Sequence, residues 1–218
     1  DDTLKTQLQS YLQRVSQPFE LVASLANPGA PTDDDVQVQQ LLADIVQASD
    51  GKITARFDGD NARKPSFSLV RPNGPALNLT FAGLPLGHEF TSLVLALLWT
   101  GGHPPKVEAD VIEQIKGLNG DFNFEVYMSL SCHNCPDVVQ ALSLMAVLNP
   151  RIKTTVIEGG MFQDEVNERQ IMAVPSTFLN GAPFGSGRML VEEIVAKLDT
   201  GAADKDAAKL SAKDPYEV

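Results

Sequence analysis

The chain has 218 residues, a formal net charge of −11 and two cysteines. The acidic balance argues against nucleic acid as a partner, because phosphate contacts need basic residues, and it disfavours anionic membrane surfaces. The longest apolar run, residues 93–99, is too short to cross a bilayer, so we expect no membrane contact.

Hydrophobic periodicity predicts two similar series of elements along the chain. In the first series we expect a helix at 4–15 with Leu4, Leu8, Tyr11, Leu12 and Val15 on one face, a strand at 19–25, a loop at 27–35, a helix at 36–48, strands at 53–57, 67–70 and 77–81, and a buried helix at 90–99. In the second we expect a helix at 107–118, a strand at 122–130, a helix at 138–148, a strand at 152–157, a short helix at 162–170, a hairpin that turns at Asn180-Gly181, and a helix at 190–198.

Both cysteines lie in one motif, Cys132-His133-Asn134-Cys135, between the predicted strand at 122–130 and the predicted helix at 138–148. Strand, Cys-x-x-Cys and helix in this order are typical of a thioredoxin-like redox site. The start of a helix carries about half a positive charge, which favours a thiolate. We assign Cys132, normally the more accessible sulfur, as the nucleophile and Cys135 as the resolving cysteine. Such a pair suits a reducing compartment, which predicts a cytoplasmic location.

Other roles for the two cysteines fit the sequence less well. A structural zinc site needs about four ligands, and an iron–sulfur cluster needs more thiolates than this chain has. Covalent haem attachment needs a histidine after the second cysteine, where Pro136 stands. A static disulfide stays open as the alternative, although it would close a very small loop and stabilise little.

An internal repeat divides the chain into two copies. Segment 82–101 aligns without a gap with segment 182–201, and upstream Lys64-Pro65 matches Val174-Pro175. Only the second copy has thiols. We therefore expect an α/β protein made of two tandem, contiguous thioredoxin-like folds that form one domain, at 1–102 and 103–199, followed by a linker at 200–218.

Four further residues are candidates for supporting roles. In a thioredoxin-like fold Pro175 is cis and lies against the motif, and Val174 offers backbone groups to an incoming extended chain. Glu89 is either an exposed carboxylate at a helix start or a charge near the thiols that raises their pKa. His133, when protonated, can stabilise a thiolate. The stretch at 185–187 lacks the third glycine of a dinucleotide fingerprint, so we expect no bound cofactor and no metal in this chain.

Two long stretches, 85–104 and 127–142, carry a family resemblance. The chain resembles the N-terminal domain of the flavoprotein component of bacterial alkyl hydroperoxide reductases. The resemblance implies that Cys132 and Cys135 take electrons that come from NADH through FAD and a second Cys-x-x-Cys, and pass them to a peroxiredoxin subunit. It also implies that Glu89 lies beside the redox pair, and that FAD and NADH bind a reductase module of a longer chain.

Two other functions stay open at this stage. One is a stand-alone tandem-thioredoxin protein disulfide oxidoreductase, although such proteins usually carry a cysteine pair in each half. The other is a module that docks a peroxiredoxin and whose thiols are only structural.

Overall fold

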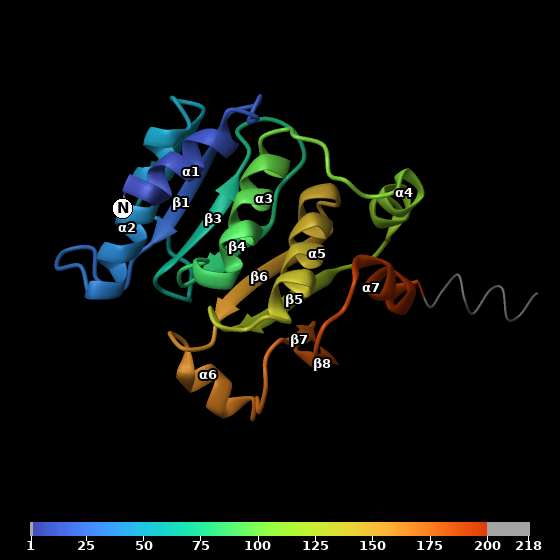
Figure 1. Ribbon diagram of the computed structural model, residues 1–218. Helices are drawn as coiled ribbons and strands as arrows, with labels where there is room; N and C mark the ends of the chain where they lie inside the picture. The colour runs from blue at the N-terminus through green and yellow to red at the C-terminus, as the bar shows by residue number, and fades with distance from the viewer. Residues whose placement is uncertain (1, 200–218) are drawn as a thin grey trace, which may run out of the picture.

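The computed structural model describes residues 2–199, and Figure 1 shows the arrangement of their elements. The first half contains α1 (Asp2–Leu12), β1 (Phe19–Ser24), α2 (Asp33–Ala48), β2 (Ile53–Arg56), β3 (Ser66–Val70), β4 (Leu79–Ala82), the short 3-10 helix η1 (Gly87–Glu89) and α3 (Phe90–Thr100). The second half contains α4 (Ala109–Gly117), β5 (Phe122–Met128), α5 (Cys135–Leu148), β6 (Ile152–Glu158), α6 (Gln163–Glu168), β7 (Ser176–Leu179), β8 (Ala182–Ser186) and α7 (Val191–Leu198).

All eight described strands form one sheet in the order β2-β1-β3-β4-β6-β5-β7-β8. Each half follows the same plan: its first two strands are parallel, and its third strand pairs antiparallel with the first and with the fourth. The halves join where β4 pairs in parallel with β6, from Leu79 opposite Thr154 to Ala82 opposite Ile157. The expected tandem thioredoxin-like α/β fold is therefore confirmed, with both copies in a single sheet.

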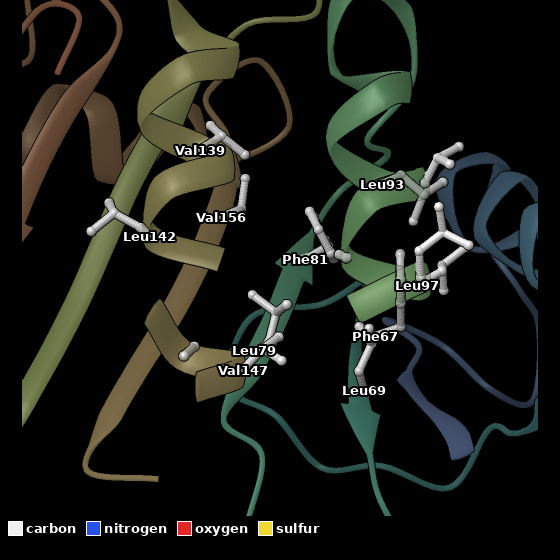
Figure 2. Packing of buried hydrophobic residues seen from close by; sticks show 14 of the residues in the cluster. Phe67, Leu69, Leu79, Phe81, Leu93, Leu97, Val139, Leu142, Val147 and Val156 are labelled. Atoms are coloured by element: carbon white, nitrogen blue, oxygen red, sulfur yellow. The ribbon is translucent and has the colours of Figure 1, made fainter. Parts of the chain in front are cut away.

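The main core lies between the sheet and the helices α1, α2, α3 and α5, and it runs across the junction of the halves (Figure 2). Strand alternation sends Phe124, Val126 and Met128 of β5 into this core, while Tyr127 faces the other side of the sheet. There Tyr127 packs with Phe178 and with residues of α6 in a second, smaller cluster. Burial of apolar area at about 25 cal/mol per Å² makes the shared main core the chief stabilising contact between the halves.

The two copies match closely at one point and differ at another. Lys64-Pro65 and Val174-Pro175 are both cis peptide bonds before the equivalent strands β3 and β7. The ungapped repeat alignment is wrong for the following strands, because Ala82 ends β4 whereas Ala182 begins β8. The first copy has a longer connection from its fourth strand to its last helix. This extra length forms η1, which carries Glu89.

Helix starts deviate from the predicted bounds where side chains cap them. Helix α2 begins at Asp33, three residues early, because Thr32 and Asp35 form a capping box. The fully buried Asp35 carboxylate also accepts hydrogen bonds from the backbone N–H groups of Ala26 at 2.7 Å and Asn27 at 2.9 Å. Tyr11 was expected on the apolar face of α1, but its side chain is 40% exposed.

Candidate active site

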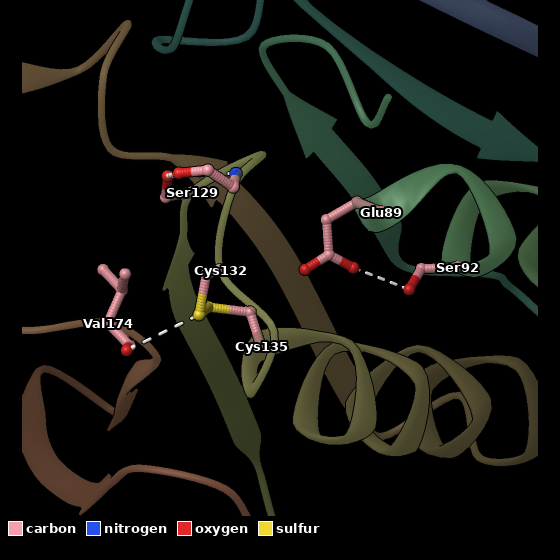
Figure 3. The surroundings of a disulfide bond; sticks show 7 residues. Glu89, Ser92, Ser129, Cys132, Cys135 and Val174 are labelled. Atoms are coloured by element: carbon pink, nitrogen blue, oxygen red, sulfur yellow. Dashed lines mark hydrogen bonds between the residues drawn. A yellow bond between two sulfur atoms is a disulfide. The ribbon is translucent and has the colours of Figure 1, made fainter. Parts of the chain in front are cut away.

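The two cysteines form a disulfide at the start of α5 (Figure 3). Cys135 is the first residue of the helix and is fully buried, whereas Cys132 lies in the preceding turn and is half-buried. Pro136 occupies the first turn, where its missing N–H removes no helical hydrogen bond. One sulfur therefore faces an incoming molecule and the other is held behind it, at the positive end of the helix dipole.

Val174 brings backbone groups beside the accessible sulfur. The carbonyl oxygen of Val174 lies 3.7 Å from Sγ of Cys132, and the cis bond to the buried Pro175 places this carbonyl just before β7. The disulfide sulfur has no hydrogen to donate, but the reduced thiol can donate to this oxygen. Val174 thus lies where an extended partner chain can pair with its backbone next to the reacting sulfur.

Glu89 is fully buried at the junction of the halves, so its interpretation as an exposed helix-start carboxylate is wrong. Its Oε1 accepts a hydrogen bond from Oγ of Ser92 at 2.6 Å, while Oε2 has no hydrogen-bond partner among the described residues. In Figure 3 this second oxygen points toward the disulfide. Burial raises the pKa of Glu89 to about 7, although the hydrogen bond from Ser92 partly opposes the shift.

Two partners of this carboxylate were not predicted. Nε2 of Gln140 donates to Oγ of Ser92 at 3.1 Å, and the Ser92 hydroxyl in turn donates to Glu89. Ser92 follows Glu89 by three residues at the start of a predicted helix, so spacing alone could have identified it. Gln140 is on α5 of the other half, and the sequence contains no signal for that contact.

The turn η1 packs directly on the loop that carries the cysteines. The backbone N–H of His88 donates to the carbonyl oxygen of Leu130 at 2.9 Å. Gly87 has φ +56°, and a Cβ atom there would lie 2.7 Å from the same carbonyl oxygen. The exposed ring of His133 meets the ring of His88, with centroids 4.4 Å apart. The first half therefore forms one wall of the site, and its contact with His133 is a ring contact on the solvent side.

Comparison with known proteins identifies the family of this site. A thioredoxin domain model matches residues 122–200. The alkyl hydroperoxide reductase flavoprotein (AhpF) of Pseudomonas aeruginosa is 63% identical over 218 residues, which is all of this chain and 41% of that protein. The NTD_N/C domain of the alkylhydroperoxide reductase AhpF of Enterococcus faecalis superposes with a TM-score of 0.80 at 26% identity, and the match covers 91% of this chain and 99% of that one. The chain belongs to the AhpF family of alkyl hydroperoxide reductases. It corresponds to the N-terminal domain of AhpF.

A third likeness concerns the fold alone. A protein disulfide oxidoreductase of Aeropyrum pernix superposes with a TM-score of 0.77 over 94% of both chains, at 20% identity. The chain itself spans about two fifths of the length of its AhpF relative in Pseudomonas aeruginosa, of which it covers 41%.

The flavin and nicotinamide chemistry of the longer AhpF chain does not fit the side chains and turns of residues 2–199. The glycines at 185 and 187 lie at the end of β8, which is an antiparallel hairpin strand. A dinucleotide cradle needs a tight turn from a parallel strand into a helix, whose N-terminus then meets the pyrophosphate. Within residues 2–199 there is also no cluster of three potential metal ligands, and no helix is long and apolar enough to span a membrane.

Proposed function

We propose that this domain is a thiol–disulfide relay, in which Cys132 and Cys135 take electrons from the FAD- and NADH-dependent module of a full-length AhpF and reduce the disulfide of a peroxiredoxin. The observation that carries the proposal is the arrangement of one half-buried and one fully buried sulfur at a helix start, beside the backbone carbonyl of Val174. A purely structural disulfide has no need of an accessible sulfur or of a backbone docking position.

Reduction of the partner takes two exchange steps. The Cys132 thiolate attacks one sulfur of the peroxiredoxin disulfide, so that a mixed disulfide forms and one peroxiredoxin thiolate leaves. Cys135 then loses its proton and attacks Sγ of Cys132, which releases the second peroxiredoxin thiolate and leaves the Cys132–Cys135 disulfide. Two electrons have passed to the partner. A dithiol of the reductase module restores the pair by the same exchange in reverse.

The neighbouring residues support these steps. Val174 pairs with an extended segment of the partner and holds its disulfide near Sγ of Cys132. Glu89 tunes the thiols, since its negative charge disfavours a nearby thiolate and its free oxygen faces the sulfurs. A carboxyl group with a pKa of about 7 also suits proton exchange with the buried Cys135 near neutral pH. His133 favours the Cys132 thiolate when its ring is protonated.

The wider assignments follow the same proposal. We place the first, thiol-free copy at 1–102, the second copy at 103–199, and a linker toward the FAD/NADH module at 200–218, a range that lies outside the described residues. FAD and NADH bind that module, and no residue of this chain is assigned to them. We place the protein in the cytoplasm, where a reducing environment keeps such a dithiol functional.

Trapping of the mixed disulfide tests the mechanism directly. In the full-length protein, Cys135→Ser should accumulate an adduct between Cys132 and a peroxiredoxin cysteine, identified by mass spectrometry of peptides under non-reducing conditions. Cys132→Ser should abolish NADH-dependent peroxiredoxin reduction. Ser131→Ala, which changes an exposed neighbour without touching a thiol, is the matched control. Full electron delivery by Cys132→Ser would exclude the relay and favour a docking module.

A further inference from the structure

A network of charged side chains joins the two halves on the face of the sheet opposite to α3 and α5. Arg63, in the first half before β3, makes a bidentate contact with Glu165 of α6: Nε and Nη2 each lie 2.8 Å from a different carboxylate oxygen. Nη2 of Arg63 also donates to Glu125 of β5. One arginine of the thiol-free half thus holds two carboxylates of the other half.

The network closes within the second half. The other oxygen of Glu125 accepts a hydrogen bond from Nη2 of Arg169 at 3.0 Å. The hydroxyl of Tyr127 donates to Glu165 at 2.6 Å, and Arg169 donates to that hydroxyl at 3.2 Å. Two arginines therefore balance two carboxylates. The side chain of Glu125 is only 9% exposed, so its charge depends on both partners.

Helix α6 has few other attachments. It has six residues, and none of them is buried. A helix of this length is not stable by itself in water, because it cannot repay the cost of nucleation. Apolar contact comes from partly buried Phe162, Val166 and Ile171, which pack on the small cluster around Tyr127. The ion pairs from Arg63 and Arg169 therefore contribute a large part of what fixes α6 on the sheet.

The chain runs from α6 straight to the active site. Arg169 follows the last turn, and its guanidinium stacks on the ring of Phe178 with 4.5 Å from Cζ to the centroid. The N–H of Ile171 bonds back to Val166 at 3.0 Å, whereas the side chain of Met172 is 94% exposed and provides no anchor. Three residues after Ile171, the carbonyl of Val174 lies beside Cys132.

We propose that Arg63 is a positioning residue for disulfide exchange: from the half without cysteines, it holds α6 and so fixes the segment 169–174 that presents the Val174 backbone to the incoming partner. The inference rests on the proposed function and deepens it. The thiol-free copy then serves the reaction from two sides, through Glu89 on one face of the sheet and through Arg63 on the other.

The test compares a protein disulfide with a small one, in the full-length protein. Arg63→Gln should raise KM for the peroxiredoxin about tenfold with little change in kcat, because it loosens a docking contact and leaves the thiols intact. The rate with 5,5′-dithiobis(2-nitrobenzoate), a small aryl disulfide that makes no backbone pairing, should stay the same. Amide hydrogen exchange should become faster at 163–174 and stay unchanged in α5.

Matched variants separate positioning from general damage. Arg56→Gln removes an exposed arginine of the same half that pairs with Glu20 and Asp58, and it should leave KM unchanged. Arg63→Lys keeps the charge and loses the bidentate geometry, so its KM should be intermediate. Glu165→Gln reaches the same contact from α6, which keeps the test open if Arg63→Gln folds poorly; its KM should rise likewise, and the double variant should add little to either single one.

Each contrary outcome has a separate meaning. An unchanged KM in Arg63→Gln and Glu165→Gln, or an equal loss of rate with both disulfides, overturns the positioning role. Failure of the unaltered full-length protein to reduce the peroxiredoxin, while it still reduces the aryl disulfide, overturns the proposed function instead.

Discussion

Replacement of Glu89 by glutamine should make the oxidised domain relatively more stable as the pH rises. The pKa of Glu89 is raised by burial from 4.5 to about 7, so the folded protein binds a proton between these values that the unfolded chain has lost. Ionisation of Glu89 therefore costs folding stability as the pH rises from about 4.5 to 7, and the full cost remains above pH 7. A shift of this size corresponds to at most about 3 kcal/mol. Glutamine has no such ionisation.

Urea unfolding at pH 5, 7 and 9 measures this effect. The disulfide should be kept intact, so that thiol ionisation does not contribute. We expect the free energy of unfolding of Glu89→Gln, relative to the native sequence, to increase by about 2–3 kcal/mol from pH 5 to pH 9. Glu113→Gln, which removes an exposed carboxylate of α4, should run parallel to the native sequence. A constant difference between Glu89→Gln and the native protein across this range would refute a buried, neutralised carboxyl at this position.

Three further changes test other parts of the site and fold. In the reduced protein, Glu89→Gln should lower the pKa of Cys132, measured by the pH dependence of alkylation; an unchanged titration removes the tuning role. Gly87→Ala should destabilise the domain by about 1–3 kcal/mol in thermal or urea unfolding, because its φ of +56° and the carbonyl of Leu130, 2.7 Å from the new Cβ, both oppose a side chain. Asp35→Asn should cost about 1–3 kcal/mol at pH 7 and less below pH 4, because backbone hydrogen bonds overcome the effect of burial and hold the pKa of Asp35 below its usual range; equal losses at both pH values would contradict this.

Local chemistry made much of the site predictable. The Cys-x-x-Cys motif between a strand and a helix placed Cys132 and Cys135 correctly at the start of α5, and the proline before β7 is cis as expected. The match of Lys64-Pro65 with Val174-Pro175 also revealed the second copy. These signals are short-range, because a few adjacent residues determine a turn, a cap or a strand start.

Contacts between the halves were not predictable in the same way. The repeat indicates two similar units, but nothing in it specifies that β4 meets β6 or that the two sheets become one. The contacts of Gln140 with Ser92 and of Arg63 with Glu165 join residues far apart in the chain, and charged residues on a predicted surface carry no mark of their partner. The early start of α2 at Asp33 was missed because three consecutive aspartates were interpreted as a loop.

The parallel pairing of β4 with β6 also explains why a copy without thiols persists in the molecule. Removal of the first copy would strip β6 of its neighbour and leave a row of unpaired backbone groups next to the redox helix, which invites pairing with other chains. The duplicate that has no chemistry of its own thus protects the edge of the one that does, and neither copy can be discarded without exposing the other to aggregation.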